Sequence, residues 1–456
     1  MGGGQAEQWG SRLGFLFAAI GFSVGLGNIW RFPYVAGEYG GSAFLFVYLA
    51  CVACIGVPLL MTELTIGRRG RGSPTRAIRA VARESGASPA WGHVGTLAVI
   101  CVFIILSFYT VISGWTFDYF VRSVLGDFEG ITGEESAGVF ASLMNNPGRL
   151  LFWHTVVNIL IVLVVRRGVQ AGTEQAVKIL MPMLFVALVI MVIYGAVEGD
   201  LGGALAFMLE PDFSKIGFKT LMVAMGQAFF SIGIGMAAMI TFGAYLPKDY
   251  SIPGSAVTIA LADTGVAIIA GFAIFPLVFG FGLEPASGPG LVFQTLPIAF
   301  GEMPGGQFFG ALFFLLLIAA AMSSCFGGAE AVVNWVDEHW GIERHKGVLY
   351  AGSGAWLLGF LTIMSFGEWS DYYPLDFIPA FAGKTIFDTL DFVAANILLL
   401  VGGFLTAFFF GWLVPKSLKL DEMRLSDGPL FNFWRVMIRF VVPPVLLVCL
   451  VMGIAE

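Results

Sequence analysis

The amino-acid sequence predicts an all-α integral membrane protein that crosses the bilayer eleven times. The chain has 456 residues, of which 57% are hydrophobic and only 12% are charged, and its mean hydropathy is +0.85. A soluble domain of this size would need far more polar residues to cover its surface. The apolar residues also fall into repeated runs of about 20 residues or more, which is the length that a helix needs to cross a membrane.

Taken in chain order, these runs predict eleven spans separated by polar or glycine-rich connections. The spans cover residues 13–37, 42–67, 91–124, 150–166, 173–197, 218–246, 254–282, 307–338, 347–366, 388–413 and 432–454.

The connections alternate in charge, and this alternation predicts the orientation. The connection after the second span carries Arg68, Arg69, Arg71, Arg76, Arg79 and Arg83 against the single acid Glu84, whereas the next one contains Asp127, Glu129, Glu134 and Glu135. Cytoplasmic connections collect Lys and Arg. We therefore expect a multi-pass protein of the cell membrane with a cytoplasmic N-terminus and, after eleven crossings, an extracytoplasmic C-terminus.

Two spans are interrupted by the same motif, SVGLG at 23–27 and SIGIG at 231–235. Five spans separate the two copies, so they cross the membrane in opposite directions. This is the pattern of an inverted repeat with discontinuous helices. We expect a single domain over 1–456, with a first repeat at 13–197, a second repeat at 218–413 and an additional helix at 432–454.

The interruptions release backbone polar groups at membrane depth, where each unpaired group costs several kcal/mol. A broken helix offers carbonyl groups to a cation and N–H groups to an anion, so an amino-acid zwitterion beside a sodium ion fits both. Asn28, Ser231 and Asp263 add the oxygen ligands that such a cation prefers, and an acid inside an apolar span indicates function by default. Two plainer interpretations stay open: serine hydroxyls can bond to their own helix, and Asp263 can be a structural acid.

The sequence contains no catalytic triad, nucleotide-binding loop or zinc motif. Cys51 and Cys54 form a C-x-x-C without a second pair, and all five cysteines lie in apolar runs, as expected for small packing residues. We expect neither an enzyme nor a nucleic-acid partner. The expected partners are an amino acid, sodium ions and the lipid bilayer.

The sequence resembles the neurotransmitter:sodium symporter family, whose members share the LeuT fold. The resemblance covers nearly the whole chain and rests on GLGNIWRFPYVAGEYGGSAFLFVY (25–48), IGVPLLMTELTIGR (55–68), GQAFFSIGIGM (226–236), SSCFGGAE (323–330) and FDTLDF (387–392). It implies the family's architecture of a five-plus-five inverted repeat with helices 1 and 6 broken. In character the chain is similar to the bacterial eleven-helix transporters of hydrophobic amino acids.

The resemblance implies two sodium sites. The first would use the Ser23 carbonyl, Asn28, Ser231, Asp263 and the substrate carboxylate. The second would use the carbonyls of Gly21, Val24 and Ala320 with the hydroxyls of Ser323 and Ser324. An alignment counted from Asp337 instead shifts the second site by one residue and puts Met322 at a hydroxyl position.

The resemblance also implies how the substrate is bound. Its carboxylate would meet the N–H groups of Gly25 and Gly27 and the hydroxyl of Tyr109, and Phe230 with Tyr109 would form an aromatic lid over the substrate. The side-chain subsite would be formed by Phe22, Ile105, Phe230, Gly233, Met236, Cys325 and Gly328, with Ser23, Ser231 and Ser324 beside it. No acidic or basic side chain lies in this set, so we expect a neutral, hydrophobic L-amino acid. Phe22 stands where monoamine transporters carry an Asp, which argues against a biogenic amine; whether it restricts the pocket to small substrates stays open.

The sequence matches both residues of the family's outer gate but not all residues of its inner gate. Arg31 and Asp391 resemble the outer gate pair, and Trp9 and Asp337 resemble the inner gate, but Ala6 stands where the family has an Arg, with Arg12 as the nearest substitute. Residues 172–182 resemble the Gly-x9-Pro element that unwinds to let water reach the second sodium ion.

Chloride-dependent members have a serine on span 7 where this chain has Ala267. Asp263 lies one turn away and can supply the negative charge, so we expect no chloride requirement.

The leading hypothesis is thus a sodium-coupled symporter that works by alternating access. The alternatives are a carrier of small neutral amino acids, a proton-coupled carrier of the same fold, and an amino-acid sensor that does not transport. Ser323 and Ser324 argue against proton coupling, which would replace the second sodium ion by a titratable group.

Overall fold

The structure, a computed structural model, describes residues 8–285 and 290–455, and in these residues all regular secondary structure is helical. The helices are α1 (Arg12–Ser23), α2 (Phe32–Glu38), α3 (Ser42–Cys51), α4 (Val57–Gly70), α5 (Pro74–Glu84), α6 (Gly92–Leu125), α7 (Gly133–Met144), α8 (Pro147–Val165), α9 (Gln175–Glu198), α10 (Leu201–Leu209), α11 (Phe218–Ile232), α12 (Ala238–Ala244), α13 (Ile252–Gly280), α14 (Leu296–Glu302), α15 (Gly306–Trp340), α16 (Arg344–Phe366), α17 (Ile386–Asp391), α18 (Leu399–Phe408), α19 (Lys416–Met423), α20 (Pro429–Val436) and α21 (Val442–Ala455). Turns of π-helix lie at Gly27–Arg31, Val52–Gly56, Val169–Glu174, Leu291–Thr295, Phe392–Leu398, Phe409–Leu413 and Met437–Val441, and 3-10 turns at Pro89–Trp91, Phe213–Lys215 and Pro379–Phe381.

Within the described residues, nine continuous helical segments are long and apolar enough to cross a membrane, or ten if the bent pair α1 and Gly27–Glu38 is one span. The predicted span 218–246 is formed by α11 and α12, which are separated by residues 233–237 and are each too short to meet that length criterion. The all-helical membrane architecture is therefore confirmed, while the full count of eleven stays a prediction.

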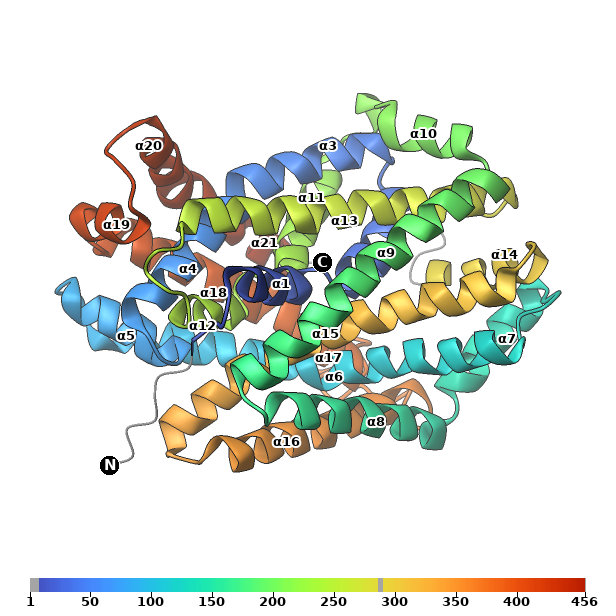
Figure 1. The fold of residues 1–456 in the computed structure, drawn as a ribbon, viewed down its shortest axis with the longest axis horizontal. Helices are drawn as coiled ribbons and strands as arrows, with labels where there is room; N and C mark the ends of the chain where they lie inside the picture. Colours follow the sequence, from blue (N-terminus) through green and yellow to red (C-terminus); the bar gives the residue numbers. More distant parts are fainter. Residues whose placement is uncertain (1–7, 286–289, 456) are drawn as a thin grey trace.

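The interrupted spans lie inside the bundle. Helix α1 packs against α15, α13 and α9, and α12 packs against α4 and α15. Long helices such as α6, α13 and α15 run along the bundle, while α5, α19 and α20 lie at one end and α7, α10 and α14 at the other (Figure 1). The arginine-rich connection lies at the first of these ends. The two ends of the bundle therefore differ in charge as well as in architecture.

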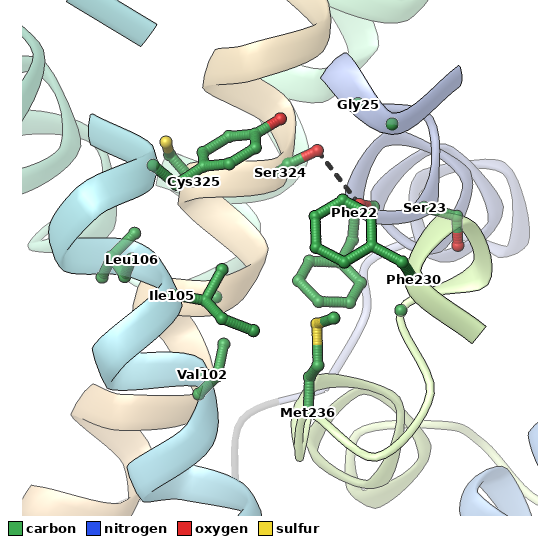
Figure 2. Close-up of a pocket in the computed structure, with 14 residues that line it drawn as sticks. Phe22, Ser23, Gly25, Val102, Ile105, Leu106, Phe230, Met236, Ser324 and Cys325 are labelled. Carbon is green, nitrogen blue, oxygen red and sulfur yellow. Dashed lines mark hydrogen bonds between the residues drawn. The ribbon is translucent and has the colours of Figure 1, made fainter. Parts of the chain in front are cut away.

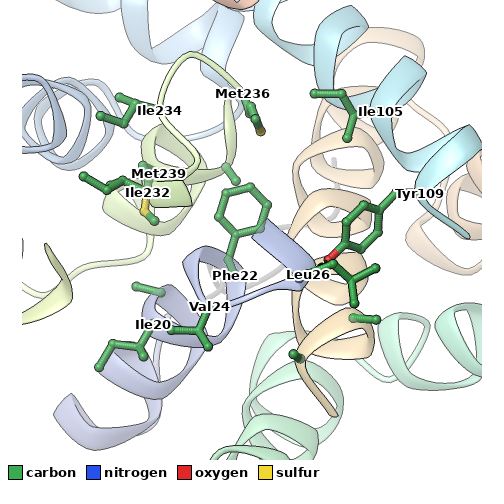
Figure 3. Close-up of a cluster of buried hydrophobic side chains, with 14 of the residues drawn as sticks. Ile20, Phe22, Val24, Leu26, Ile105, Tyr109, Ile232, Ile234, Met236 and Met239 are labelled. Carbon is green, nitrogen blue, oxygen red and sulfur yellow. Dashed lines mark hydrogen bonds between the residues drawn. The ribbon is translucent and has the colours of Figure 1, made fainter. Parts of the chain in front are cut away.

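Apolar side chains surround both interruptions. Ile20, Phe22 and Val24 at the end of α1 lie beside Ile232 and Met239, which flank the second break (Figure 3). All of these side chains are buried. The interrupted backbone is thus enclosed by protein, as a non-helical segment at membrane depth must be.

Candidate functional site

The first break lies between α1 and the turn that begins at Gly27, and the two halves are bent by 49°. Here glycine provides space. A Cβ at Gly25 would lie 2.6 Å from the Ser324 hydroxyl and 2.7 Å from the Tyr109 hydroxyl. The Leu26 N–H donates to that tyrosine oxygen at 3.0 Å. The backbone of the break can approach α6 and α15 this closely only without a side chain.

The second break, residues 233–237, needs glycine for a different reason. Gly233 and Gly235 have φ values of +72° and +80°, and Ala237 has +63°, a conformation that glycine adopts at little cost and alanine only under strain. The Gly235 N–H donates to Glu63 Oε1 at 2.7 Å. The two copies of the sequence motif therefore serve two physical needs: room at the first break and backbone conformation at the second.

A first oxygen cluster joins the two breaks, and we define it as Asn28, Tyr48, Ser231 and Asp263. The Asn28 Nδ2 donates to Ser231 Oγ at 2.9 Å, to Asp263 Oδ1 at 2.8 Å and to the Asp263 carbonyl at 3.0 Å. Ser231 Oγ donates to Asp263 Oδ2 at 2.7 Å, and the Tyr48 hydroxyl lies 3.5 Å from both. All four side chains are buried.

Ser23 lies at the edge of this cluster. Its hydroxyl donates to the Ile232 carbonyl at 3.0 Å and to the Ala19 carbonyl at 3.1 Å. The structure therefore joins Asn28, Ser231 and Asp263, which lie far apart in the sequence, by direct hydrogen bonds. The Asn28 amide nitrogen faces the other two side chains, while its oxygen accepts from the Gly25 N–H at 3.1 Å.

A second oxygen cluster lies between α1 and α15, and we define it as the carbonyls of Gly21, Phe22 and Ala320 with the hydroxyls of Ser323 and Ser324. The Ser324 Oγ lies 3.3, 3.0 and 3.2 Å from the Gly21, Phe22 and Ala320 carbonyls. The Ser323 Oγ donates to the Ala320 carbonyl at 3.0 Å. Val24, which the sequence placed in this set, is buried and has no hydrogen bond to the cluster within the described residues, while the Phe22 carbonyl is an addition.

A cavity lies between the breaks and helices α6 and α15. Apolar side chains from α6 face Phe22, Phe230 and Met236 across it (Figure 2). Its lining consists of Phe22, Ser23, Gly25, Gly27, Val102, Ile105, Leu106, Tyr109, Phe230, Gly233, Met236, Ser324, Cys325 and Gly328. No acidic or basic side chain is among these lining residues, and every side-chain subsite residue predicted from the sequence is.

Two lining residues, Val102 and Leu106, were missed in the sequence. They precede Tyr109 by seven and three positions on α6, so they share its helical face together with Ile105. That spacing was available in the sequence, and extending the face from Tyr109 would have found both.

Phe22 occupies part of the space that two glycines would otherwise leave. A Cβ at Gly233 would lie 2.4 Å from the Phe22 ring, and one at Gly327 would lie 2.6 Å from it. The ring also meets Phe242 edge to face, with centroids 5.9 Å apart. Gly328 is different, because a Cβ there would lie 3.2 Å from Val102 and 3.9 Å from Phe22. The space beside Gly233 is therefore filled by the Phe22 ring, whereas Gly328, which also lines the cavity, is packed against Val102.

Comparisons with known proteins assign this architecture to a family. The model of the sodium:neurotransmitter symporter family matches residues 6–129 and 139–456. The chain belongs to this family. An uncharacterized sodium-dependent transporter of Bacillus subtilis (strain 168) is 37% identical over 444 residues, covering 96% of this chain and 95% of the relative.

Among solved structures, the crystal structure of MhsT in complex with L-phenylalanine matches with a TM-score of 0.89 and 40% identity, covering 98% of this chain and 99% of MhsT. The human sodium- and chloride-dependent creatine transporter 1 is 26% identical over 384 residues, covering 72% of this chain and 59% of that protein. The chain is thus a sodium-dependent symporter with the LeuT fold, a multi-pass membrane protein of a transporter family.

In this symporter, the residues predicted as the outer gate do not form an ion pair with each other. The Arg31 guanidinium donates to Gln227 Oε1 at 2.8 Å and lies 5.3 Å from the centroid of the Phe230 ring. No ion pair between Arg31 and Asp391 is present in the described part of the chain. Gln227 in turn donates to the Gly27 carbonyl at 2.8 Å, so Arg31 is linked to both breaks.

The other end of the symporter is closed by contacts that the sequence did not predict. Trp9 is buried, and its Nε1 donates to the Phe242 carbonyl at 3.1 Å. Glu174 accepts hydrogen bonds from the Gly10 N–H at 2.8 Å and from the Ser11 hydroxyl at 2.9 Å, and it pairs with Lys178 at 2.7 Å. These bonds join the segment before α1 to the π-helical turn that leads into α9.

Asp337 and Arg12, expected at this closure, are exposed and have no side-chain ion pair among the described residues. The neighbouring acid Glu338 instead accepts from the Ser73 N–H at 2.7 Å and pairs with Arg76 at 3.3 Å. Both of these adjacent acids are exposed, and of the two only Glu338 has a side-chain partner in the described part of the chain. Position 6 lies outside the described residues.

Proposed function

We propose that this symporter couples the inward movement of two sodium ions to the uptake of neutral, hydrophobic L-amino acids, including large and aromatic ones. The observation that carries this proposal is the apolar cavity between the two breaks, whose lining includes Ser23 near the first oxygen cluster and Ser324 of the second. A substrate there can present its zwitterionic backbone to the broken helices and its side chain to apolar residues alone. A charged side chain would lose its hydration without gaining a partner.

Each oxygen cluster would hold one sodium ion. The first would use Ser23, Asn28, Ser231 and Asp263 together with the substrate carboxylate, and the second would use Gly21, Ala320, Ser323, Ser324 and the added Phe22 carbonyl. Carbonyl, hydroxyl and carboxylate oxygens are the ligands that suit a hard cation. Because both clusters bridge α1 to helices of the surrounding bundle, an ion bound there would favour the conformation in which those elements are together.

The substrate carboxylate would meet the Tyr109 hydroxyl and the N–H groups of Gly25 and Gly27 at the first break, in place of the bond that the Gly25 N–H now makes to Asn28 Oδ1 at 3.1 Å. Phe230 would cover the substrate, and the Arg31 guanidinium would hold the Phe230 ring in place by lying over it. The side chain would extend toward Met236 and Gly328, which line the cavity. Phe22 packs against Gly233 and Gly327 and so shapes one wall, and the L-phenylalanine bound by the structurally similar MhsT supports a large substrate.

Transport would not require chloride. Asp263 places a carboxyl group within the first oxygen cluster, close to Tyr48 and Ser231, and in its ionised form it would make an additional anion unnecessary there. The end of the bundle that carries Trp9 and the arginine-rich α5 would face the cytoplasm, together with the N-terminus, because cytoplasmic segments collect Lys and Arg. The C-terminus would then be extracytoplasmic.

The test is uptake of labelled L-phenylalanine by the full-length protein in liposomes. We expect accumulation under an inward sodium gradient, none under a potassium or proton gradient alone, and competition by leucine and other apolar amino acids but not by aspartate or lysine. Proton-driven uptake that does not require sodium would indicate a proton-coupled carrier instead. Tight sodium-dependent binding with no uptake would indicate a sensor, and competition by glycine and alanine alone would indicate a carrier for small substrates.

A further inference from the structure

Three cations gather where the tenth predicted span ends, and we call Lys419, Arg435 and Arg439 the basic cluster. The Gly411 carbonyl accepts from Lys419 Nζ at 2.9 Å and from Arg439 Nε at 2.7 Å. Lys419 is buried, with its ammonium 5.6 Å from the Phe410 ring centroid and 5.9 Å from that of Trp434. Arg435 precedes Arg439 by four residues and is partly exposed.

No carboxylate balances this charge. Within residues 8–285 and 290–455, none of the three cations forms an ion pair: the nearby acids are used elsewhere, Glu422 by Arg68 and Asp427 by Lys416. The pKa of Lys419 is lowered to about 7, first by burial and then by repulsion from the charges of Arg439 and Arg435.

The helix end that the cations approach offsets only part of their charge. The C-terminus of a helix carries about half a negative elementary charge, against up to three positive charges in the basic cluster. Capping of the helix therefore explains the bonds to Gly411 but leaves a net positive site. Arg435, which has no hydrogen bond or ion pair from its side chain in the described residues, is not explained by capping at all.

An apolar surface adjoins the basic cluster, and we call Trp412, Leu413 and Phe440 the apolar face. These side chains are 45%, 38% and 58% exposed, respectively. Trp412 and Phe440 meet edge to face at 5.3 Å, and the Arg439 guanidinium lies 5.1 Å from the Trp412 ring centroid. Exposed aromatic and aliphatic groups are stable on a span only where lipid covers them.

The depth of these groups fits the boundary between headgroups and hydrocarbon. A helix needs about 20 residues to cross the hydrocarbon core, and the helical segment Pro429–Ile454 is longer than that. Counting back about 20 residues from Ile454 puts Arg435 at the boundary, so its side chain and that of Arg439 can reach the headgroup layer.

We propose that the basic cluster binds the headgroup of an anionic phospholipid, whose acyl chains lie along the apolar face. Arg435 and Arg439 contact the headgroup phosphate, for which guanidinium groups are suited, while Lys419 adds charge from the protein side. This site lies apart from the transport cavity and does not depend on the proposed substrate.

The experiment measures lipid binding to the full-length protein in detergent by native mass spectrometry. The probes are phosphatidylglycerol and phosphatidylcholine with the same acyl chains, with inorganic phosphate as a separate competitor. We expect the wild type to bind phosphatidylglycerol more tightly than phosphatidylcholine. Arg435→Gln should weaken phosphatidylglycerol binding about fivefold and leave phosphatidylcholine binding unchanged.

Arg83→Gln is the matched control, because Arg83 is an exposed arginine at the same end of the bundle and has no side-chain partner among the described residues. It should bind both lipids like the wild type. Arg439→Gln should weaken phosphatidylglycerol binding as well, but it also loses the bond to Gly411, so Arg435→Gln is decisive. Equal binding of the two lipids by the wild type, equal losses in Arg83→Gln and Arg435→Gln, or displacement of the lipid by phosphate would each overturn the proposal.

Discussion

The carboxylate of Glu174 accepts a hydrogen bond from the Ser11 hydroxyl at 2.9 Å, and the same carboxylate accepts from the Gly10 N–H at 2.8 Å. Ser11 is also the N-cap of α1, since its oxygen accepts from the Gly14 N–H at 2.9 Å. The residue that starts α1 is thus held by the residue that precedes α9. Gly172, two residues before Glu174, begins the Gly-x9-Pro element. Unwinding there would therefore break the hydrogen bonds from Ser11 and Gly10 to Glu174.

We therefore predict that Glu174→Gln loosens this closure. A glutamine has one acceptor oxygen where the carboxylate has two, and it loses the pair with Lys178. Hydrogen bonds to charged groups contribute about 1.5–3 kcal/mol, so the open form should gain about tenfold or more in population. Hydrogen–deuterium exchange of the amides of residues 10–14 should accelerate by that factor, and sodium-driven uptake should fall.

Glu343→Gln serves as the control for Glu174→Gln, because Glu343 is an exposed acid at the same end of the bundle. Its exchange at residues 10–14 should match the wild type. Unchanged exchange in Glu174→Gln would mean that Trp9 and the other contacts hold the closure without this carboxylate.

A second prediction concerns Asp263 and chloride. Wild-type uptake should be the same when chloride is replaced by gluconate, because the carboxylate is the fixed negative charge. Asp263→Asn should reduce sodium-driven uptake by about tenfold or more, since an amide offers one acceptor to donors that now bond to two carboxylate oxygens. Asp212→Asn, which changes an exposed acid outside the cavity, should transport normally. Uptake by the wild type that collapses in gluconate would refute the chloride-independent mechanism.

The sequence allowed the architecture and most of the cavity to be predicted, because these depend on short-range patterns. Apolar runs predict the spans, and the two glycine motifs predict the breaks, without any knowledge of how the rest of the chain packs. Asp263 stood out because an acid in an apolar run is rarely accidental. Glu63, which accepts the Gly235 N–H, is an acid of the same kind in the second span, and the same argument applied to it would have found the support of the second break.

What could not be predicted depends on how side chains pack across the bundle. Phe22 could have filled the cavity or lined it, and only its contacts with Gly233, Gly327 and Phe242 decide between these roles. The contacts of the inner closure also depend on packing across the bundle. Asp337 and Glu338 are adjacent exposed acids, and only Glu338 bonds to Ser73 and Arg76, which a match by alignment cannot distinguish.

A third prediction concerns Gly328, which lines the cavity. In Gly328→Ala the added methyl group would lie 3.2 Å from Val102 and 3.9 Å from Phe22, so it takes volume from the side-chain end of the cavity. We expect affinity for L-phenylalanine to fall about tenfold, within the cost of overpacking a well-packed site, and affinity for small amino acids to change little. Competition uptake with a series of apolar amino acids measures this.

Gly226→Ala is the matched control for Gly328→Ala, because a Cβ at Gly226 meets nothing within 4 Å. It should keep the substrate profile of the wild type. If Gly328→Ala weakened all amino acids equally, the substrate side chain would not lie beside Gly328.

The last prediction is a pH dependence that arises at Lys419. Burial, followed by the charges of Arg439 and Arg435, lowers the pKa of this lysine to about 7, whereas an unfolded lysine titrates near pH ~10.4. Between these two values the unfolded chain holds a proton that the folded chain does not, so stability rises as the pH is raised from about 7 to about 10. Below about pH 7 both forms are protonated, and the folded protein bears the full cost of the buried charge.

Thermal unfolding in detergent at a series of pH values tests this dependence. Lys419→Met removes the titrating group. The melting temperature of the wild type should therefore rise relative to that of the variant as the pH is raised. Lys346→Met, which alters an exposed lysine, should follow the wild type. Because an anionic headgroup would favour the charged ammonium, added phosphatidylglycerol should flatten the rise in the wild type and have no such effect on Lys419→Met. A wild-type profile parallel to that of Lys419→Met would mean that Lys419 keeps its proton throughout.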